Sequence, residues 1–164
     1  TEPGQNGMDR VEFMLSANPG ESLKPLEKVA SGGEMSRIML AFKAIAANAD
    51  SIPTLIFDEI DTGISGHIAA VVGEKMVSIA DNHQVLCVTH LPQIAALADV
   101  HFMVQKQDDG QTTRTSLKRL EMEERYEYIA RMMSGMEDSK LAYEHARELI
   151  THSEEIKQKR RKNK

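Results

Sequence analysis

The chain has 164 residues, of which 41% are hydrophobic, 27% charged and 4% aromatic, which is typical of one globular domain with an aliphatic, methionine-rich core. Its single cysteine excludes a disulfide scaffold, and no run of 18 apolar residues is present to span a membrane, so we expect a soluble cytoplasmic protein. The net charge is −5, but the last eight residues hold six of the twenty Lys and Arg residues and no acid. This leaves −11 on the rest and excludes a protein that coats nucleic acid over its whole surface.

The first half of the chain alternates short apolar runs with segments of helical spacing. Alternating apolar residues over 11–15 predict a strand. The apolar runs 54–57 and 85–88 predict strands that are buried on both faces, as in a parallel sheet. The other elements predicted here are a frayed start at 1–7, a turn at Asn18-Pro19-Gly20, and helices over 34–48 and 65–80.

The second half predicts a hairpin followed by two helices, with Asp108-Asp109-Gly110 as the hairpin turn. Strands that alternate with helices predict an α/β fold in a single domain over residues 1–164, with a mixed, partly parallel sheet flanked by helices. The elements predicted in this half are a short helix at 92–98, strands at 100–105 and 112–120, helices at 121–134 and 138–152, and a basic tail at 153–164, which is either a fraying helix end or disordered.

The first motif that can carry chemistry is Ser31-Gly32-Gly33-Glu34, at the start of the predicted helix over 34–48. Two glycines let a ligand approach the backbone closely, and a helix start offers unpaired N–H groups and the positive end of the helix dipole. Ser31 adds a hydroxyl donor, so the motif suits a phosphate group. The same residues are equally consistent with a Gly-Gly turn and a serine cap.

The second motif is a pair of carboxylates, Asp58 and Glu59, directly after the apolar run over 54–57. Ligands of open α/β sheets bind outside the carboxyl ends of strands. Asp58 could hold Mg²⁺ through water, because Mg²⁺ prefers oxygen ligands and keeps several waters. Glu59 could orient or deprotonate an attacking water. The alternative is an acidic loop without a catalytic role.

The third motif, Val88-Thr89-His90, ends the next predicted strand. His90 could contact a γ-phosphate and respond to its loss, or it could be a strand-end histidine that caps the following turn. Ser31 precedes Asp58 by 27 residues and His90 follows it by 32, so each motif stands at an element end where a sheet-edge nucleotide site would need it.

In this order and spacing the three motifs resemble the C-terminal half of an ABC-type ATPase head. The resemblance implies the C-terminal lobe of a P-loop ABC-type ATPase head, with ATP and Mg²⁺ as its ligands. It also implies that residues 31–34 are the signature motif, that 54–59 is the Walker B segment with catalytic Glu59 and Mg²⁺-binding Asp58, and that His90 is the switch histidine.

Further motifs run through residues 7–150, namely Val11-Glu12-Phe13, Asn18-Pro19-Gly20-Glu21, Lys24-Pro25-Leu26, the stretches 29–37 and 57–66, and Thr89-His90-Leu91-Pro92-Gln93-Ile94-Ala95. In these motifs the chain resembles the RecN family of bacterial DNA double-strand-break repair proteins, which are related to structural-maintenance-of-chromosomes (SMC) proteins. It implies a DNA repair ATPase of the bacterial cytoplasm that associates with the nucleoid. A weaker resemblance continues through Ile129-Ala130-Arg131-Met132 and His145-Ala146-Arg147-Glu148-Leu149.

A G-x-x-x-x-G-K-[ST] phosphate loop does not occur in the 164 residues. The resemblance implies that this Walker A motif belongs to an N-terminal lobe of the same protein, which a coiled coil separates from this half. We therefore expect the chain alone to bind ATP weakly or not at all and to be inactive as an ATPase.

The resemblance further implies a homodimer of heads with ATP between them. Asp58, Glu59 and His90 would serve the nucleotide of their own head, while Ser31 and Gly33 would contact the γ-phosphate held by the opposite head. The full-length protein would then engage DNA, without a membrane partner. Two alternatives stay open: a non-catalytic dimerisation or docking lobe, and a head fragment of another SMC-like protein.

One departure from the broader superfamily lies in the loop after Walker B. Many ABC heads carry an aspartate seven residues after Asp58, where this chain has Ser65. The resemblance places an inter-head loop at Asp61, Thr62, Gly63 and Ser65. Asp61 either takes part of the role of the missing aspartate or only caps the helix over 65–80.

The sequence gives no specific functional role to Cys87, Arg37 or the basic tail. Cys87 is expected to be a packed core thiol, and Arg37 pairs with a carboxylate or with DNA. The basic residues of the tail either contact DNA phosphates or form a solvated charge run. These tail residues are Lys157, Lys159, Arg160, Arg161, Lys162 and Lys164.

Overall fold

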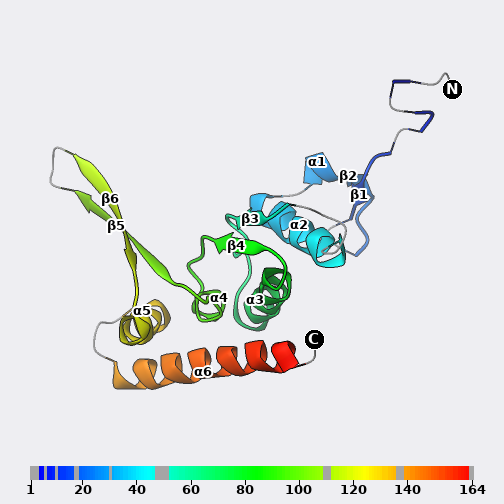
Figure 1. Ribbon diagram of the computed structural model, residues 1–164. Coiled ribbons are helices and arrows are strands. Elements are labelled where there is room, and N and C mark those ends of the chain that lie inside the picture. The colour runs from blue at the N-terminus through cyan, green and yellow to red at the C-terminus, as the bar shows by residue number, and fades with distance from the viewer. Residues whose placement is uncertain are drawn as a thin grey trace.

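The computed structural model describes residues 4–5, 7–9, 11–16, 19–29, 31–46, 52–108, 112–135 and 139–162 (Figure 1). The expected turn residues Asn18, Asp109 and Gly110 and part of the expected frayed start lie outside these ranges. The elements, in chain order, are β1 (Met14–Leu15), β2 (Lys24–Pro25), α1 (Leu26–Val29), α2 (Gly32–Ala46), β3 (Thr54–Phe57), α3 (Gly66–Ala80), β4 (Gln84–Cys87), α4 (Pro92–Ala95), β5 (Phe102–Asp108), β6 (Thr113–Arg119), α5 (Met122–Ser134) and α6 (Lys140–Lys162).

Helices and strands alternate, which confirms the α/β class, but the described strands form three separate pairs instead of one mixed sheet. The β3–β4 pair is parallel and runs from Thr54 opposite Gln84 to Phe57 opposite Cys87. The β1–β2 and β5–β6 pairs are antiparallel. β1 is shorter than the strand predicted over 11–15, because its pairing with β2 covers only two residues.

One hydrophobic core lies between α3 and one face of the β3–β4 pair. Ile60 and Ile79 are fully buried in it, next to Phe57 at the end of β3. Burying a side chain of this size stabilises the fold by roughly 1.5–3 kcal/mol. Gly73 lies where α3 meets α4: a Cβ at this position would be 3.7 Å from the Ile94 Cα of α4 and would collide with Cδ1 of Leu97, just after α4. This packing holds the carboxyl ends of β3 and β4 in a fixed place.

The opposite face of the β3–β4 pair is apolar and exposed. Ile56 is 71%, Leu86 47% and Val88 61% exposed. The prediction that the runs 54–57 and 85–88 are buried on both faces is therefore wrong for this face. α3 packs against the other face, and within the described part of the chain no element covers this one. Parallel sheets are normally covered on both faces.

α5 and α6 build a second core, in which Ile129 and Ile150 are fully buried. α5 begins with a capping box and ends at Gly135, whose φ of 67° places it in the left-handed region that glycine adopts without strain. α6 continues to Lys162, well beyond the predicted helix over 138–152, so residues 153–162 are helical and not a disordered tail. None of the described helices is long and apolar enough to cross a membrane.

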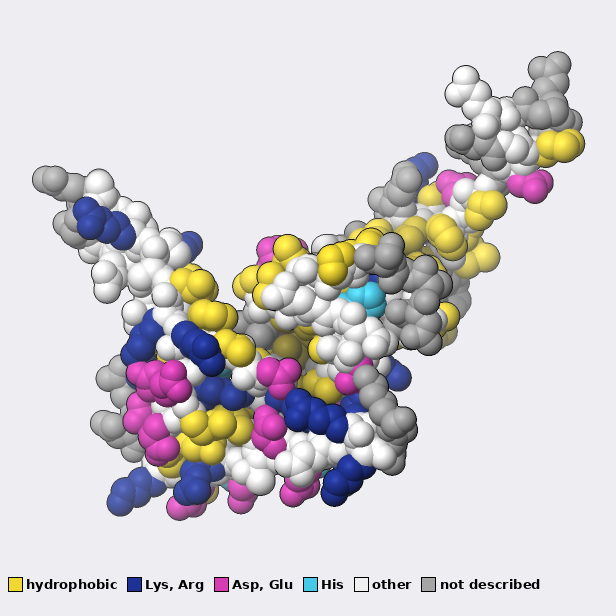
Figure 2. Space-filling model, in the orientation of Figure 1, with side chains coloured by type: hydrophobic (Ala, Val, Ile, Leu, Met, Phe, Trp, Pro, Cys, Tyr) yellow, Lys and Arg dark blue, Asp and Glu magenta, His cyan; other side chains and the backbone are white. Residues whose placement is uncertain are grey.

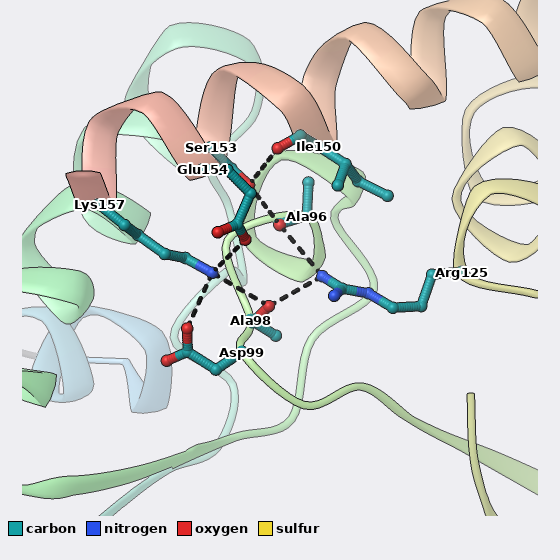
Figure 3. A network of polar contacts seen from close by, with 8 residues as sticks. All are labelled: Ala96, Ala98, Asp99, Arg125, Ile150, Ser153, Glu154 and Lys157. Carbon is teal, nitrogen blue, oxygen red and sulfur yellow. Dashed lines mark hydrogen bonds and ion pairs between the residues drawn. The ribbon is translucent and has the colours of Figure 1, made fainter. Parts of the chain in front are cut away.

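A buried polar network joins α5 and α6 to the chain after α4 (Figure 3). Arg125 Nη2 donates to the carbonyl oxygens of Ala96, at 3.4 Å, and of Ala98, at 2.8 Å. Ser153 Oγ donates to the same Ala96 oxygen at 2.9 Å, and Lys157 Nζ donates to the Ala98 oxygen at 3.3 Å. Carbonyl oxygens at the C-terminal end of a helix carry partial negative charge, which favours cations there. Both helices are thereby fixed to one short segment.

The β5–β6 hairpin projects away from the body, on the side opposite the N-terminal arm (Figure 1). Its register runs from Phe102 opposite Arg119 to Asp108 opposite Thr113. Figure 2 shows hydrophobic side chains gathered at the base of the hairpin and along the N-terminal arm, whereas acidic and basic side chains gather over α5 and α6. A smaller hydrophobic patch lies among these charged side chains, and Met122, Met133 and Leu141 are exposed apolar residues of α5 and α6.

Candidate functional site

The carboxyl ends of β3 and β4 lie side by side. The Val88 N–H donates to the Phe57 carbonyl oxygen at 3.0 Å, just past the last pair of the ladder. Asp58 and Glu59 follow β3, and His90 follows β4 by three residues, so their backbones leave the same edge. This is the edge at which ligands of α/β sheets bind.

The acid pair forms a tight turn. The Glu59 N–H donates to Asp58 Oδ1 at 2.9 Å, and the Thr62 N–H donates to the Glu59 carbonyl oxygen at 3.0 Å. Ser36 Oγ of α2 donates to the Asp58 carbonyl oxygen at 3.0 Å. Glu59 has a φ of 56°, in the left-handed region that a glutamate rarely adopts. Such a conformation costs about 1–3 kcal/mol and persists only where surrounding contacts impose it.

α2 begins at Gly32, with Ser31 as a capping residue. The Ser31 N–H donates to Glu34 Oε2 at 2.9 Å, and the Glu34 N–H donates to Ser31 Oγ at 3.3 Å. The hydrogen bonds from the Ser31 N–H and then from its hydroxyl hold the pKa of the Glu34 carboxyl below its usual range. The serine-cap interpretation is therefore confirmed as local structure, and it does not decide whether the turn also meets a phosphate.

The two glycines of this turn lie directly against the acid pair. A Cβ at Gly32 would be 2.5 Å from Glu59 Oε2, and a Cβ at Gly33 would be 2.8 Å from the Glu59 carbonyl oxygen. Gly33 meets a backbone oxygen, so close packing requires glycine at that position, whereas the neighbour of Gly32 is the end of the flexible Glu59 side chain, which can move away. The structure thus brings the first and second motifs together within one chain. In this arrangement two carboxylates, Glu34 and Glu59, stand at the N-terminus of α2.

Arg37 lies one turn along α2 and contacts the loop that follows β3. Its Nη1 donates to the carbonyl oxygens of Ile60, at 3.1 Å, and of Thr62, at 2.8 Å. Its hydrogen-bond partners are thus backbone oxygens, while its charge adds to the hydrogen bonds from Ser31 in lowering the pKa of the Glu34 carboxyl. The guanidinium holds the peptide groups on both sides of Asp61.

Asp61 is 3% exposed and ties this loop to the end of β4. Its Oδ2 accepts hydrogen bonds from Thr89 Oγ1 at 2.6 Å and from the His90 N–H at 2.8 Å, and lies 3.0 Å from His90 Nδ1. Burial by itself would raise the pKa of Asp61, but the hydrogen bonds from Thr89 and His90 outweigh it and lower the pKa below its usual range. The interpretation of Asp61 as a helix cap is wrong, because Ser65 occupies the N-cap position of α3.

His90 is held at its backbone and at Nδ1, while its side chain is 73% exposed. The cap of the following turn is Thr89, whose Oγ1 accepts a hydrogen bond from the Leu91 N–H at 3.1 Å. The interpretation of His90 as a cap is therefore wrong. The ring is anchored on one side and open to solvent on the other.

The rest of the expected inter-head loop is exposed. Thr62, Gly63 and Ser65 all lie on the surface, and Gly63 has a φ of 75° that suits glycine. Asp61 is the buried member of this set. Its contacts give it an internal role.

Cys87 sits beneath this edge and packs against the first core, as expected. Burial, and then the nearby Asp61 and Asp58 carboxylates, raise the pKa of its thiol to about 12. The thiol is therefore protonated at neutral pH and unsuited to nucleophilic chemistry.

The donor set can be compared with what Mg²⁺ requires. Within the described ranges no cluster of three or more His, Cys, Asp or Glu side chains could hold a metal ion. Mg²⁺, however, commonly binds through one or two carboxylates and keeps its remaining waters and phosphate ligands. Asp58, exposed at the end of β3, fits this mode of binding.

The structure divides the basic residues of 157–164, which were expected either to contact DNA or to form a solvated charge run, into paired and exposed ones. The Lys157 side chain is 4% exposed, and besides the Ala98 carbonyl its Nζ contacts Asp99 Oδ1 at 3.0 Å and Glu154 Oε1 at 2.8 Å (Figure 3). It is therefore not placed to contact DNA. Arg160 pairs with Asp81 at 3.2 Å. The exposed members of the set are Lys159, Arg161 and Lys162, and Lys164 lies outside the described residues.

The sequence did not reveal that Thr89 donates to Asp61 or that Arg37 donates to backbone oxygens. Both act through contacts across more than 20 positions of the chain. Thr89 stands beside the expected switch histidine, and Arg37 stands one turn after the expected signature. Their positions next to these motifs are the sequence signal that could have identified them as part of the site.

The chain is similar in sequence to proteins of one name from several bacteria. The chain is 51% identical over 153 residues to the DNA repair protein RecN of Halalkalibacterium halodurans, a match that covers 93% of this chain and 27% of that protein. It is 46% identical over 154 residues to RecN of Bacillus subtilis, with 93% and 27% covered. It is also 46% identical over 147 residues to RecN of Streptomyces coelicolor, with 90% and 26% covered.

The chain thus spans about a quarter of the length of the curated relatives it matches, and it corresponds to their C-terminal part. No protein-family model matches it. A solved chain from work on ATP-driven dimerization and DNA stimulated activation of SMC ATPases has a TM-score of 0.46 and 20% identity, and covers 74% of this chain and 80% of that one.

Proposed function

Because this chain belongs to the RecN family, matching the C-terminal part of its members, we propose that it is the signature and Walker B half of a RecN-like DNA repair ATPase head. One observation supports this most. The acid pair and His90 follow two paired parallel strands at one edge, and the Gly32-Gly33 turn lies against the same edge. A nucleotide site needs these groups together.

Each residue at this edge has a separate task in the proposed head. Asp58 holds Mg²⁺ through water, and the bound ion supplies positive charge against the phosphates of ATP. Glu59 orients the attacking water and accepts its proton. His90 presents the exposed side of its ring to the γ-phosphate.

The working unit is a pair of heads. An N-terminal lobe of the same protein contributes the Walker A cradle and the coiled coil. Ser31, Gly32 and Gly33 contact the γ-phosphate carried by the opposite head, so ATP forms part of the interface. Loss of that phosphate weakens the interface and shifts the population towards separated heads. This cycle controls the engagement of DNA in double-strand-break repair, and Lys159, Arg161 and Lys162 offer local contacts to DNA phosphates.

The packing of the glycine turn adds one requirement. Glu34 and Glu59 both stand at the N-terminus of α2, where a phosphate of the opposite head would have to lie. Two anions at this position would repel it. The Glu59 carboxylate therefore leaves Gly32 before the heads close, and in doing so becomes available to the attacking water.

The experiment is a Glu59→Gln change in the head completed by its Walker A-bearing lobe. Turnover of ATP should fall about 10²- to 10⁴-fold, because the amide cannot accept the proton of the water. ATP binding and head association should persist. Glu74→Gln makes the same chemical change on the exposed surface of α3 and should have no effect. Normal turnover by Glu59→Gln would contradict the role given to Glu59.

A second candidate function is a non-catalytic dimerisation or docking lobe. The exposed apolar face formed by Ile56, Leu86 and Val88 favours it, because contiguous apolar surface marks interaction sites. A docking lobe would bury this apolar face against a partner without hydrolysing ATP. Measuring ATP hydrolysis by the completed head therefore separates the docking lobe from the ATPase half.

A further inference from the structure

Asp61 contacts the residues after β4 through a single carboxylate oxygen. This oxygen, Oδ2, accepts hydrogen bonds from Thr89 Oγ1 at 2.6 Å and from the His90 N–H at 2.8 Å, and it lies 3.0 Å from His90 Nδ1. An ionised carboxylate only accepts hydrogen bonds. An unprotonated Nδ1 at 3.0 Å would set its lone pair against that oxygen, so the contact favours a neutral His90 ring with its proton on Nδ1 and with Nε2 unprotonated.

The carboxylate is itself rigidly held. Ile60, the preceding residue, is fully buried in the first core. Arg37 Nη1 donates to the carbonyl oxygens of Ile60 and Thr62, at 3.1 and 2.8 Å, on both sides of Asp61. The burial of Asp61 also excludes water that would compete for its oxygens. A fixed acceptor of this kind can set both the orientation and the tautomer of a histidine.

The His90 ring needs such an anchor, because its side chain is 73% exposed. An exposed imidazole held only by its backbone would rotate among its rotamers and present either nitrogen. Thr89 supports the arrangement from the neighbouring position, since its hydroxyl donates to Asp61 and accepts from the Leu91 N–H. The backbone of the loop and the ring are thus fixed by the same carboxylate.

We propose that Asp61 is a positioning residue for His90: it holds the proton on Nδ1 and aims Nε2 at the nucleotide edge formed by Asp58 and Glu59. This inference rests on the proposed function, in which His90 meets the γ-phosphate. Asp61 acts only through His90 and touches neither nucleotide nor metal. Its place in the loop after Walker B is explained by this internal contact and not by contact with a second head.

The first test measures the tautomer directly and needs no nucleotide. Two-bond ¹⁵N–¹H spectra of the ¹⁵N-histidine-labelled chain, at a pH where the imidazoles are neutral, report which ring nitrogen carries the proton. A His90→Gln spectrum identifies the His90 signals among those of the six histidines. His90 should be protonated at Nδ1 in the wild type and should shift towards the Nε2–H form in Asp61→Asn.

Control variants separate this effect from a general disturbance. Thr89→Ser keeps the hydroxyl and should retain the wild-type signals, whereas Thr89→Val removes one donor to Asp61 and should shift them part of the way. Asp108→Asn makes the same carboxylate-to-amide change at the end of β5 and should leave His90 unaltered. An Nε2–H tautomer in the wild type overturns the proposal even if Asp61→Asn does not fold.

The second test uses the head completed by its Walker A-bearing lobe. Asp61→Asn should lower kcat by about tenfold or more while KM for ATP changes by less than about threefold, since only the orientation of a reacting group is lost. An altered tautomer with unchanged kcat overturns the positioning role. A wild-type head that does not hydrolyse ATP overturns the proposed function instead, and the tautomer measurement then shows separately whether the Asp61–His90 contact exists.

Discussion

Glu59 combines an unfavourable backbone conformation with a carboxylate packed against glycine, and neighbouring hydrogen bonds explain why it persists. The Thr62 N–H closes the turn onto its carbonyl oxygen, and Ser36 fixes the preceding peptide. Each bond of this kind contributes about 0.5–1.5 kcal/mol, so together they can offset the cost of a left-handed glutamate. A strained residue at a strand end is a common feature of functional sites.

Cys87 gives a prediction at the same scale. Its thiol has a pKa raised to about 12 by burial and by the carboxylates of Asp61 and Asp58, against an ordinary value of 9.0. Alkylation by iodoacetamide at pH 8 should be about a hundredfold or more slower in the folded chain than in urea, because the thiolate is the reactive form. The chain has one cysteine, so mass spectrometry follows this site alone. Equal rates in both states would contradict the buried, protonated thiol.

Residue types at the strand ends could be predicted from the sequence, but their partners could not. Apolar runs followed by Asp58 and by Thr89-His90 predict that polar groups meet at one edge, and the structure places them there. The choice between a loop and a cap for Asp61 could not be made, because its partners lie 28 and 29 positions away. Local propensity carries no information on contacts of that length.

α6 ends at Lys162, well beyond the helix predicted over 138–152. Its buried residues follow one another at helical spacing, namely Ala142, Ala146, Ile150, Ser153 and Lys157. The stripe continues past Ile150 with a serine and a lysine, so a search for apolar residues stops there. The buried lysine is tolerated because it meets a carbonyl oxygen and two carboxylates. Polar groups that are buried and satisfied hide the true end of a helix from hydrophobic patterning.

The same network gives a prediction for the element. Lys157→Ala should lower the free energy of unfolding by about 1–3 kcal/mol, because the Ala98 carbonyl and the two acids lose their shared donor. Lys159→Ala is the matched control, on an exposed position of the same helix, and should change it by less than about 0.5 kcal/mol. Equilibrium unfolding in urea measures both. An equal, small effect of the two variants would show that the network does not stabilise α6.

At the scale of the whole molecule, the main finding is an apolar sheet face without a cover in the described part of the chain. The apolar runs over 54–57 and 85–88 predict coverage on both faces, and the structure provides it on one. Phe13 and Phe42 form a second apolar contact, with ring centroids 5.6 Å apart, and both side chains are exposed. Surfaces of this kind are stable when another lobe packs on them. The proposed Walker A-bearing lobe would fill that place.

The most direct test of the account is Mg²⁺-dependent ATP hydrolysis by this chain, alone and mixed with a separately made N-terminal lobe that carries a Walker A motif. We predict no turnover by either part alone and turnover by the mixture, and we predict that this turnover is lost when the mixture contains Glu59→Gln. A folded, associated mixture without hydrolysis would contradict the ATPase and leave the docking lobe as the function of this chain.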